Sequence, residues 1–156
     1  CEPAVYRHFG PEPMSAEDCW RRMCATIGQW TMNGFGGWAV EERASGQLVG
    51  SVGLFTAWRA LQPEFGDEPE MGWIMATETH GRGLAHEACQ AVLDWAQIHL
   101  PPTSIWAIIA PENEPSLRLA DKLGFRIVGL TEYHGDPTIV LKRSPATAAT
   151  AATAAA

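Results

Sequence analysis

Residues 79–87 read Thr-His-Gly-Arg-Gly-Leu-Ala-His-Glu and lie between a strand-like run and an amphipathic helix. Glycines at such a turn let the backbone bend tightly and approach a ligand closely. The first N–H groups of a helix lack internal partners and attract anions, and Arg82 would add a planar cationic fork. The stretch therefore indicates a phosphate-binding turn, although a tight turn without a ligand would use the same glycines.

Two better-known phosphate-binding patterns do not fit this stretch. The phosphate loop of nucleoside triphosphatases needs Gly-Lys-Ser/Thr, which does not follow the glycines here. A dinucleotide fingerprint needs another glycine spacing and an acidic residue at the end of a following strand, about 20 residues on. The sequence has neither feature.

A second stretch, residues 111–125, reads Pro-Glu-Asn-Glu-Pro-Ser-Leu-Arg-Leu-Ala-Asp-Lys-Leu-Gly-Phe. With the first stretch it resembles the GNAT superfamily of N-acetyltransferases, in the RimJ/RimL-like branch of ribosomal-protein acetyltransferases. The family's loop Arg/Gln-x-x-Gly-x-Gly/Ala corresponds to residues 80–85, its Asn-x-x-Ser/Ala to 113–116, and its Leu-Gly-Phe to 123–125. Both motifs have the family's order and distance, and the resemblance covers about residues 3–142.

The chain of 156 residues is long enough for one domain with a hydrophobic core. We expect this domain at residues 1–143, followed at 144–156 by an uncharged, low-complexity Ala/Thr tail without an assigned function. The net charge of −7 argues against nucleic acid as a partner. It would favour a cationic acceptor, although solubility alone accounts for such a charge equally well.

Four cysteines lack the spacing of a metal site: Cys1, Cys19, Cys24 and Cys89. We therefore expect free thiols in a reducing compartment, and so a cytoplasmic protein without a bound metal. No apolar run approaches the length of a membrane span, so no membrane partner is expected.

The spacing of apolar residues predicts three helices and six strands. A helix should start at the capping residue Ser15, and the main helix should bury a stripe of Ala85, Ala88, Cys89, Val92 and Ala96. The helices are expected at 15–29, 82–99 and 114–123, and the strands at 37–43, 47–55, 69–76, 104–110, 125–131 and 137–142.

The resemblance implies an α+β fold of the GNAT type, in which helices flank a mixed, mostly antiparallel and twisted sheet. The predicted order α-β-β-β-α-β-α-β-β matches the family with one gap. The family opens with another strand and helix, so we expect an N-terminally incomplete domain without its first strand. The strand at 69–76 should splay from the strand at 104–110.

The resemblance also implies acetyl-CoA as a cosubstrate and places its binding residues. The cofactor's phosphates would meet the backbone of Gly81, Gly83, Leu84 and Ala85 with the charge of Arg82. The pantetheine arm would lie between the splayed strands, against the backbone of Ile74, Met75 and Ala76, and would contact Asn113. An amide near Met75 would polarise the thioester carbonyl. Asn113 is also a normal helix cap, so both roles stay open.

Glu70 matches the acidic residue of the family's Glu-x-Gly-Tyr/Trp pattern, and the resemblance makes it the candidate base for the attacking amine. A carboxylate among apolar groups such as Trp73 could have a raised pKa, which suits a base. An ordinary exposed strand residue is an equal alternative. His134, beside Tyr133 in the last hairpin, is a second candidate base.

Many family members carry a tyrosine four residues after the Ser116 position, as the acid for the leaving thiolate. This chain has Ala120 there, which leaves the hydroxyl of Ser116 near the expected sulfur. The missing tyrosine motivates an alternative, a non-catalytic acyl-CoA-binding module, and a purely structural domain is a third hypothesis.

The acceptor amine is expected to belong to a protein N-terminus, a polyamine or amino acid, or an aminoglycoside-like compound. Its groove should be built from the helix at 15–29, the loop at 56–68 and the last hairpin. Glu64, Asp67 and Glu68 in this loop would suit a cation. Homodimers are common in such folds.

Overall fold

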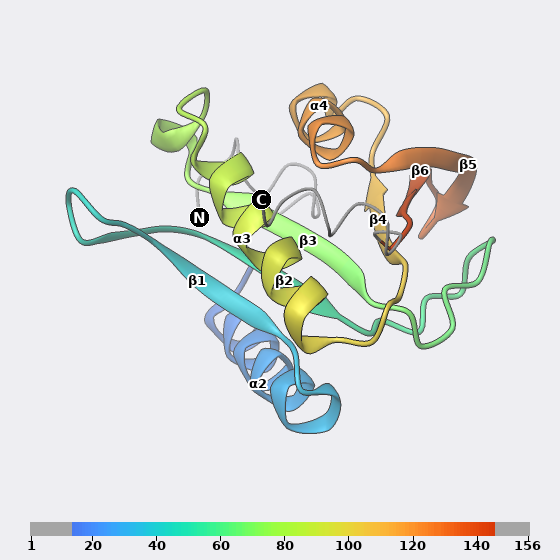
Figure 1. The fold of residues 1–156 in the computed structure, drawn as a ribbon, viewed down its shortest axis with the longest axis horizontal. Helices are drawn as coiled ribbons and strands as arrows, with labels where there is room; N and C mark the ends of the chain where they lie inside the picture. Colours follow the sequence, from blue (N-terminus) through green and yellow to red (C-terminus); the bar gives the residue numbers. More distant parts are fainter. Residues whose placement is uncertain (1–13, 146–156) are drawn as a thin grey trace, which may run out of the picture.

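The computed structural model describes residues 14–145, which form one six-stranded sheet with helices on both sides (Figure 1). The helices are α2 (Ala16–Asn33), α3 (Leu84–His99) and α4 (Glu114–Lys122), with a short 3₁₀ helix, η1 (Thr77–Thr79). The strands are β1 (Gly37–Glu42), β2 (Gln47–Phe55), β3 (Glu70–Met75), β4 (Ile105–Ile109), β5 (Arg126–Tyr133) and β6 (Asp136–Arg143). Their order in the sheet is β1-β2-β3-β4-β6-β5.

The two central strands diverge, as the family resemblance implied. β3 and β4 are parallel, and they pair only where Glu70 lies opposite Trp106. At this closed end the Trp106 amide donates to the Pro69 carbonyl at 2.9 Å. The other neighbouring strands are antiparallel and pair over most of their length. The sheet therefore opens as a V whose mouth lies at the carboxyl ends of β3 and β4.

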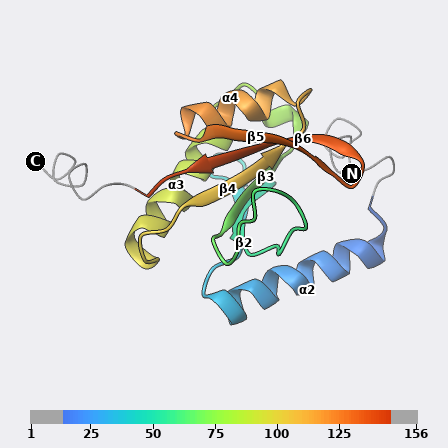
Figure 2. The same cartoon turned by 90° about the vertical axis from the view of Figure 1, so that its right-hand side faces the viewer.

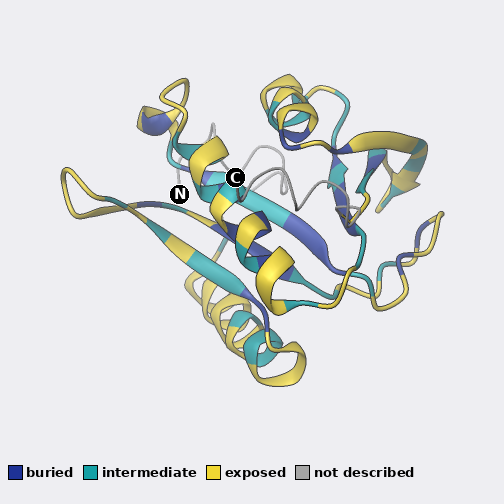
Figure 3. Ribbon diagram, in the orientation of Figure 1, coloured by how far each residue is buried: buried dark blue, intermediate teal, exposed yellow. Residues whose placement is uncertain are grey.

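Helix α2 begins where the sequence predicted and ends later. The Ser15 side chain caps it by accepting a bond from the Asp18 amide. The helix continues past residue 29 to Asn33, because Gly34 takes the left-handed conformation (φ 73°) that ends it. Figure 2 shows α2 across the sheet from α3 and α4, and Figure 3 shows that α2 has no fully buried residue.

The main core lies between the sheet and the helices α3 and α4. The predicted apolar stripe of α3 is buried at Cys89, Val92 and Ala96, and half-buried at Ala85 and Ala88. Leu93 adds a fully buried side chain that the prediction omitted. These residues pack against apolar side chains of β2, β3, β4 and β6, among them Val52, Leu54, Met71, Ala107 and Leu141.

Residues 56–69, which connect β2 to β3, cover the other face of β4. Leu61 and Phe65 from this loop pack with Trp106 and Val140. The rings of Phe65 and Trp106 stack with their centroids 4.4 Å apart. β4 is thus covered on both faces, which explains the nearly continuous apolar run in its sequence.

The predicted order of elements is confirmed, and the strand boundaries agree to within two residues. Helix α3 starts at Leu84 instead of residue 82, because Gly83 takes the left-handed conformation (φ 82°) and serves as its cap. The predictions for residues 1–13 and for the tail beyond residue 145 fall outside the described residues.

Three cysteines of the described segment 14–145 are free thiols, of which Cys19 and Cys24 are exposed and Cys89 is buried. Burial raises the pKa of the Cys89 thiol to about 12. Within the same segment, no helix is long and apolar enough to cross a membrane, and no cluster of three or more His, Cys, Asp or Glu side chains could hold a metal ion.

The spacing of β1 and β2 predicts that Gly53→Ala destabilises the protein. A Cβ at Gly53 would lie 2.7 Å from the Cα of Gly37 and 2.9 Å from the carbonyl oxygen of Gly36. Because backbone atoms cannot move aside cheaply, we expect the free energy of unfolding to fall by about 1–3 kcal/mol. Urea denaturation measures the change.

Gly28→Ala is the matched control, because no atom lies within 4 Å of the Cβ it would add to α2. This substitution should raise the free energy of unfolding by about 0.5–1 kcal/mol. Equal stabilities of the two variants would contradict the close approach of the strands.

Candidate active site

The mouth of the V presents backbone groups that β3 and β4 do not pair with each other. The Ala76 amide donates instead to the Val49 carbonyl on β2, at 2.8 Å. Because alternate residues of an antiparallel strand direct their polar groups to opposite sides, Ile74 also faces β2, while Trp73 and Met75 face the V. Of the three residues predicted to pair with the pantetheine arm, Met75 directs its amide into the gap, whereas Ile74 and Ala76 do not.

A loop at residues 77–83 leads from the mouth of the V into α3. Gly81 and Gly83 have φ angles of 74° and 82°, which favour glycine, so the loop itself requires them. Side chains cap α2 and α4, but none caps α3. The first intrahelical bond of α3 returns to the Gly83 carbonyl, so the amides of Leu84 and Ala85 have no acceptor within the helix.

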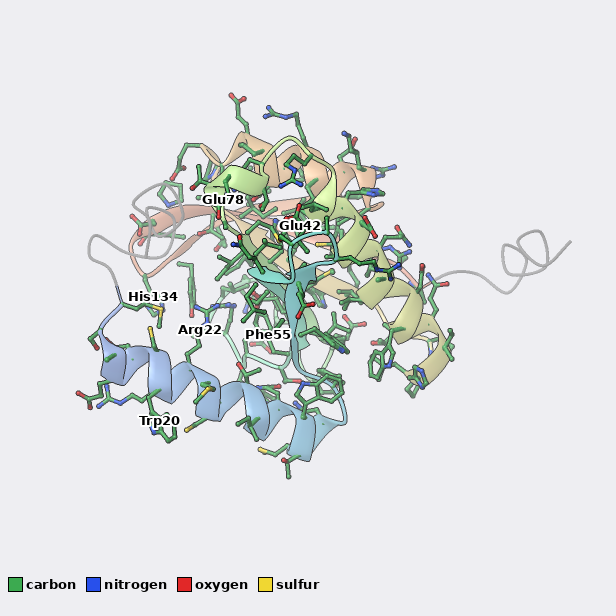
Figure 4. The ribbon with its side chains drawn as sticks, turned by 90° about the vertical axis from the view of Figure 1, so that its left-hand side faces the viewer. Trp20, Arg22, Glu42, Phe55, Glu78 and His134 are labelled. Carbon is green, nitrogen blue, oxygen red and sulfur yellow. The ribbon has the colours of Figure 1, made fainter. Side chains whose placement is uncertain are left out.

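Arg82 is held on this loop by Glu42, at the end of β1, through an ion pair. Hydrogen bonds from Ser45 and from Arg82 keep the pKa of the Glu42 carboxyl below its usual value. Figure 4 shows Glu42 at the same end of the molecule as Glu78 of η1. Any anion that binds Arg82 must therefore compete with Glu42 for its charge. The sequence pattern gave no means to identify Glu42 as the partner of Arg82.

Asn113 and Ser116 lie at the start of α4, and Ser116 contacts Trp73 of β3. The Asn113 side chain accepts a bond from the Ser116 amide at 3.3 Å, which makes Asn113 the helix cap. The indole N–H of Trp73 donates to the Ser116 hydroxyl oxygen, also at 3.3 Å. Because tryptophan can only donate, the hydroxyl hydrogen of Ser116 can be given to another acceptor. Ala120, one turn later, is fully buried.

Glu70 lies at the closed end of the V, with 4% of its side chain exposed. Arg59, from the loop at 56–69, binds both carboxylate oxygens: Nη2 donates to Oε1 at 2.8 Å, and Nε donates to Oε2. The same guanidinium lies over the ring of Tyr133, 4.9 Å from its centroid. Burial raises the pKa of Glu70 above its usual value, and the bonds and charge of Arg59 oppose that rise.

The three segments predicted to form an acceptor groove are in contact. Gln29 of α2 bonds both backbone groups of Thr56: its Nε2 donates to the carbonyl at 3.0 Å, and the Thr56 amide donates to its Oε1 at 2.9 Å. Arg59 links the same loop to Tyr133 of the last hairpin. His134, the second candidate base, is exposed at the hairpin tip with its ring centroid 4.1 Å from that of Tyr133.

The acidic residues of the loop at 56–69 differ in their surroundings. Glu68 accepts bonds from Lys142 at 3.1 Å and from the Trp106 indole at 2.6 Å. Its charge is thus neutralised within the domain, whereas Glu64 and Asp67 are exposed. The prediction that all three could attract a cation therefore narrows to Glu64 and Asp67.

Both sequence motifs thus lie beside one V-shaped gap: the glycine loop at its mouth, and the start of α4 facing β3. The chain matches the acetyltransferase (GNAT) domain over residues 1–126. It belongs to the GNAT family of acetyltransferases. The fold predicted from the two motifs is confirmed by this match and by solved structures.

One solved structure and one curated relative show how far the likeness of this GNAT protein extends. A solved structure from Bordetella pertussis, assigned to the GNAT acetyltransferases, is 34% identical, with a TM-score of 0.79, and covers 84% of this chain and 78% of that one. The protein YkkB of Bacillus subtilis is 28% identical over 106 residues, which are 68% of this chain and only 59% of YkkB.

A phosphinothricin acetyltransferase from Sinorhizobium meliloti, solved in complex with AcCoA, shares the fold at 18% identity and a TM-score of 0.67. The match covers 88% of this chain and 73% of that one. Family and fold are therefore established, while the roles of individual residues stay predictions.

The cap of α4 predicts how two Asn113 variants differ in stability. Asn113→Ala should lower the free energy of unfolding by about 1 kcal/mol, because the Ser116 amide loses its acceptor. Asn113→Asp keeps an acceptor at that position and should keep the stability. Urea denaturation measures both variants, and a loss of stability with aspartate equal to that with alanine would contradict the capping role.

Proposed function

We propose that this GNAT protein transfers the acetyl group of acetyl-CoA to a primary amine by direct attack. The observation that carries the proposal is the V between β3 and β4, which has the helix start of α3 at its mouth and a carboxylate, Glu70, at its closed end. The AcCoA bound by the Sinorhizobium meliloti structure supports the choice of donor. The donor needs an anion site, a strand-like channel and a polarised carbonyl.

The phosphates of acetyl-CoA would be bound by the loop at residues 77–83 and the start of α3. The Leu84 and Ala85 amides have no helical acceptor, and the helix dipole adds partial positive charge to them. Gly81 and Gly83 leave open space where side chains would stand. Arg82 would add charge while Glu42 holds it against the loop.

The pantetheine arm would lie in the mouth of the V, where its amides can bond the backbone of β3 as a strand would. The Met75 amide faces this gap and is our candidate donor to the thioester carbonyl. As the amine nitrogen attacks the carbonyl carbon, negative charge develops on the oxygen, and a fixed N–H donor stabilises it.

Glu70 would accept the proton of the attacking amine, directly or through a water molecule. The bidentate pair with Arg59 uses one lone pair on each oxygen, and an ionised carboxylate offers about four acceptor sites in all. Burial raises the pKa of Glu70, which strengthens it as a base. His134 is exposed at the hairpin tip and lacks this buried setting.

Ser116 would stabilise the departing thiolate by hydrogen bonding when the C–S bond breaks. Its oxygen accepts the bond from Trp73, and this bond orients the hydroxyl hydrogen away from the indole. The RimJ/RimL-like branch and a cytoplasmic location belong to the same proposal, the first on the two sequence motifs and the second on the free thiols.

Calorimetric titration with acetyl-CoA, dephospho-CoA and adenosine tests the phosphate site. We expect micromolar binding of acetyl-CoA that weakens as phosphates are removed, because the α3 start binds the anion. Gly83→Asp should abolish this binding, since it adds a negative charge at φ 82° where the phosphates would lie.

Gly28→Ala is the matched control for this titration, because it lies on α2, far from the loop in sequence, and meets no atom within 4 Å. A folded wild-type sample that binds no acetyl-CoA would overturn the proposal. Equal affinities of Gly83→Asp and wild type would overturn the assignment of the loop.

Glu70→Gln tests the base, with acetyl-CoA consumption followed over a panel of amino acids, spermidine and a peptide with a free N-terminus. We expect unchanged acetyl-CoA affinity and a fall in kcat of about 10²–10⁴-fold. Ser116→Ala should give a smaller loss. Full activity of Glu70→Gln would exclude Glu70 as the base, and binding of acetyl-CoA without turnover by the wild type would favour the non-catalytic module.

A further inference from the structure

We propose that Arg59 is a positioning residue for Glu70: it keeps this buried carboxylate ionised and oriented at the closed end of the V. The inference rests on the proposed role of Glu70 as the base. Arg59 is neither part of the two family motifs nor near Glu70 in the sequence, and it reaches Glu70 from the loop at 56–69.

The geometry restrains both the charge and the rotation of the carboxylate. Nε and Nη2 of Arg59 bind one oxygen each, so Glu70 cannot rotate without breaking both bonds. Tyr133 restrains the guanidinium in turn, because the cation lies 4.9 Å from the centroid of the ring. Arg59 itself has only 19% of its side chain exposed.

The loop that carries Arg59 is itself anchored by contacts with helix α2 and with the sheet. Gln29 of α2 binds the Thr56 backbone at the start of the loop. Leu61 and Phe65 pack under it against Trp106 and Val140. Contacts with α2, β4 and β6 therefore fix the loop that carries Arg59, as a positioning role requires.

Electrostatics distinguish this pair from an ordinary surface ion pair. Burial alone would favour the neutral form of Glu70, and Arg59 opposes that effect. Burial likewise acts against the charge of Arg59, but the bonds and charge of Glu70 and Tyr133 leave its pKa raised. A buried pair of this kind adds little net stability compared with apolar side chains, so stability alone does not explain its presence.

The other charged or titratable groups of the neighbouring elements contact residues other than Glu70. Glu68 of the loop and Lys142 of β6 pair with each other beside Trp106. His134 is exposed and contacts the ring of Tyr133, and no hydrogen bond or ion pair joins it to Glu70 among the described residues. From α2, Arg22 extends toward the sheet, while Trp20 points away from it (Figure 4). Among the described residues, Arg59 is the cation that binds Glu70.

The test compares unfolding equilibria from pH 5 to 8 for the wild type, Arg59→Gln, Glu70→Gln and the double variant. Without Arg59, burial acts on Glu70 unopposed, so the pKa of Glu70 in the folded protein should lie further above its pKa in the unfolded chain. The folded state then binds more protons, so stability must fall as pH rises above the unfolded pKa of a glutamate, up to the raised folded pKa.

We expect the Arg59→Gln unfolding constant to rise up to about tenfold per pH unit in this window, relative to wild type. The wild type also has a raised Glu70 pKa, but the pH range over which its stability falls should end at a lower pH, because Arg59 opposes the rise. The double variant should lose the extra slope, and Arg59→Lys should restore part of the wild-type behaviour. Arg21→Gln, at an exposed helix arginine, is the matched control.

A merely structural role of Arg59 would lower stability equally at every pH. The same pH slope in Arg59→Gln and wild type would therefore overturn the proposal, and Arg59→Lys decides the point if the glutamine variant does not fold. With an acceptor from the panel, the acid limb of kcat/KM should also move to higher pH in Arg59→Gln. An unmoved limb would overturn the proposal as well, whereas full activity of Glu70→Gln would refute only the proposed base.

Discussion

The divergence of β3 from β4 is the constraint on which the rest of the site depends. Two parallel strands that pair only at Glu70 and Trp106 leave backbone donors and acceptors along the mouth of the V. An unpaired buried backbone group costs about 1–3 kcal/mol, so such a gap must face water or a ligand with amides of its own. The ring of Phe65 stacks on Trp106 at the closed end, the one place where the two strands pair.

Two arginines respond differently to their place along this gap. Arg82 at the mouth is half exposed, so solvent screens its pair with Glu42 and an incoming phosphate can compete for it. Arg59 at the closed end is mostly buried, and its pair with Glu70 is screened much less. In the function proposed above, Arg82 would therefore exchange partners when acetyl-CoA binds, while Arg59 would keep Glu70 as its fixed partner.

Elements that depend on local signals were predictable from the sequence. The Ser15 cap and the glycines before α3 each act within a few residues, and the structure has them where they were expected. Helix α2 ran four residues longer than predicted because it ends only at Gly34, which takes the left-handed conformation. The V followed from the family resemblance, since no local pattern specifies how two distant strands diverge.

The partners of the site residues were not predictable, because they come from distant parts of the chain. Arg82 and Glu42 are 40 residues apart in the sequence, and Trp73 and Ser116 are 43 apart. The chemistry of these side chains does not distinguish the true partners from the many other residues that could pair with them. The burial of Ala120 explains why this chain has no tyrosine at that position. Ala120 is fully buried in the core, where a tyrosine would overpack its neighbours. In the proposed mechanism, the hydroxyl for the thiolate would instead come from Ser116 in the first turn of α4, which accepts a bond from Trp73.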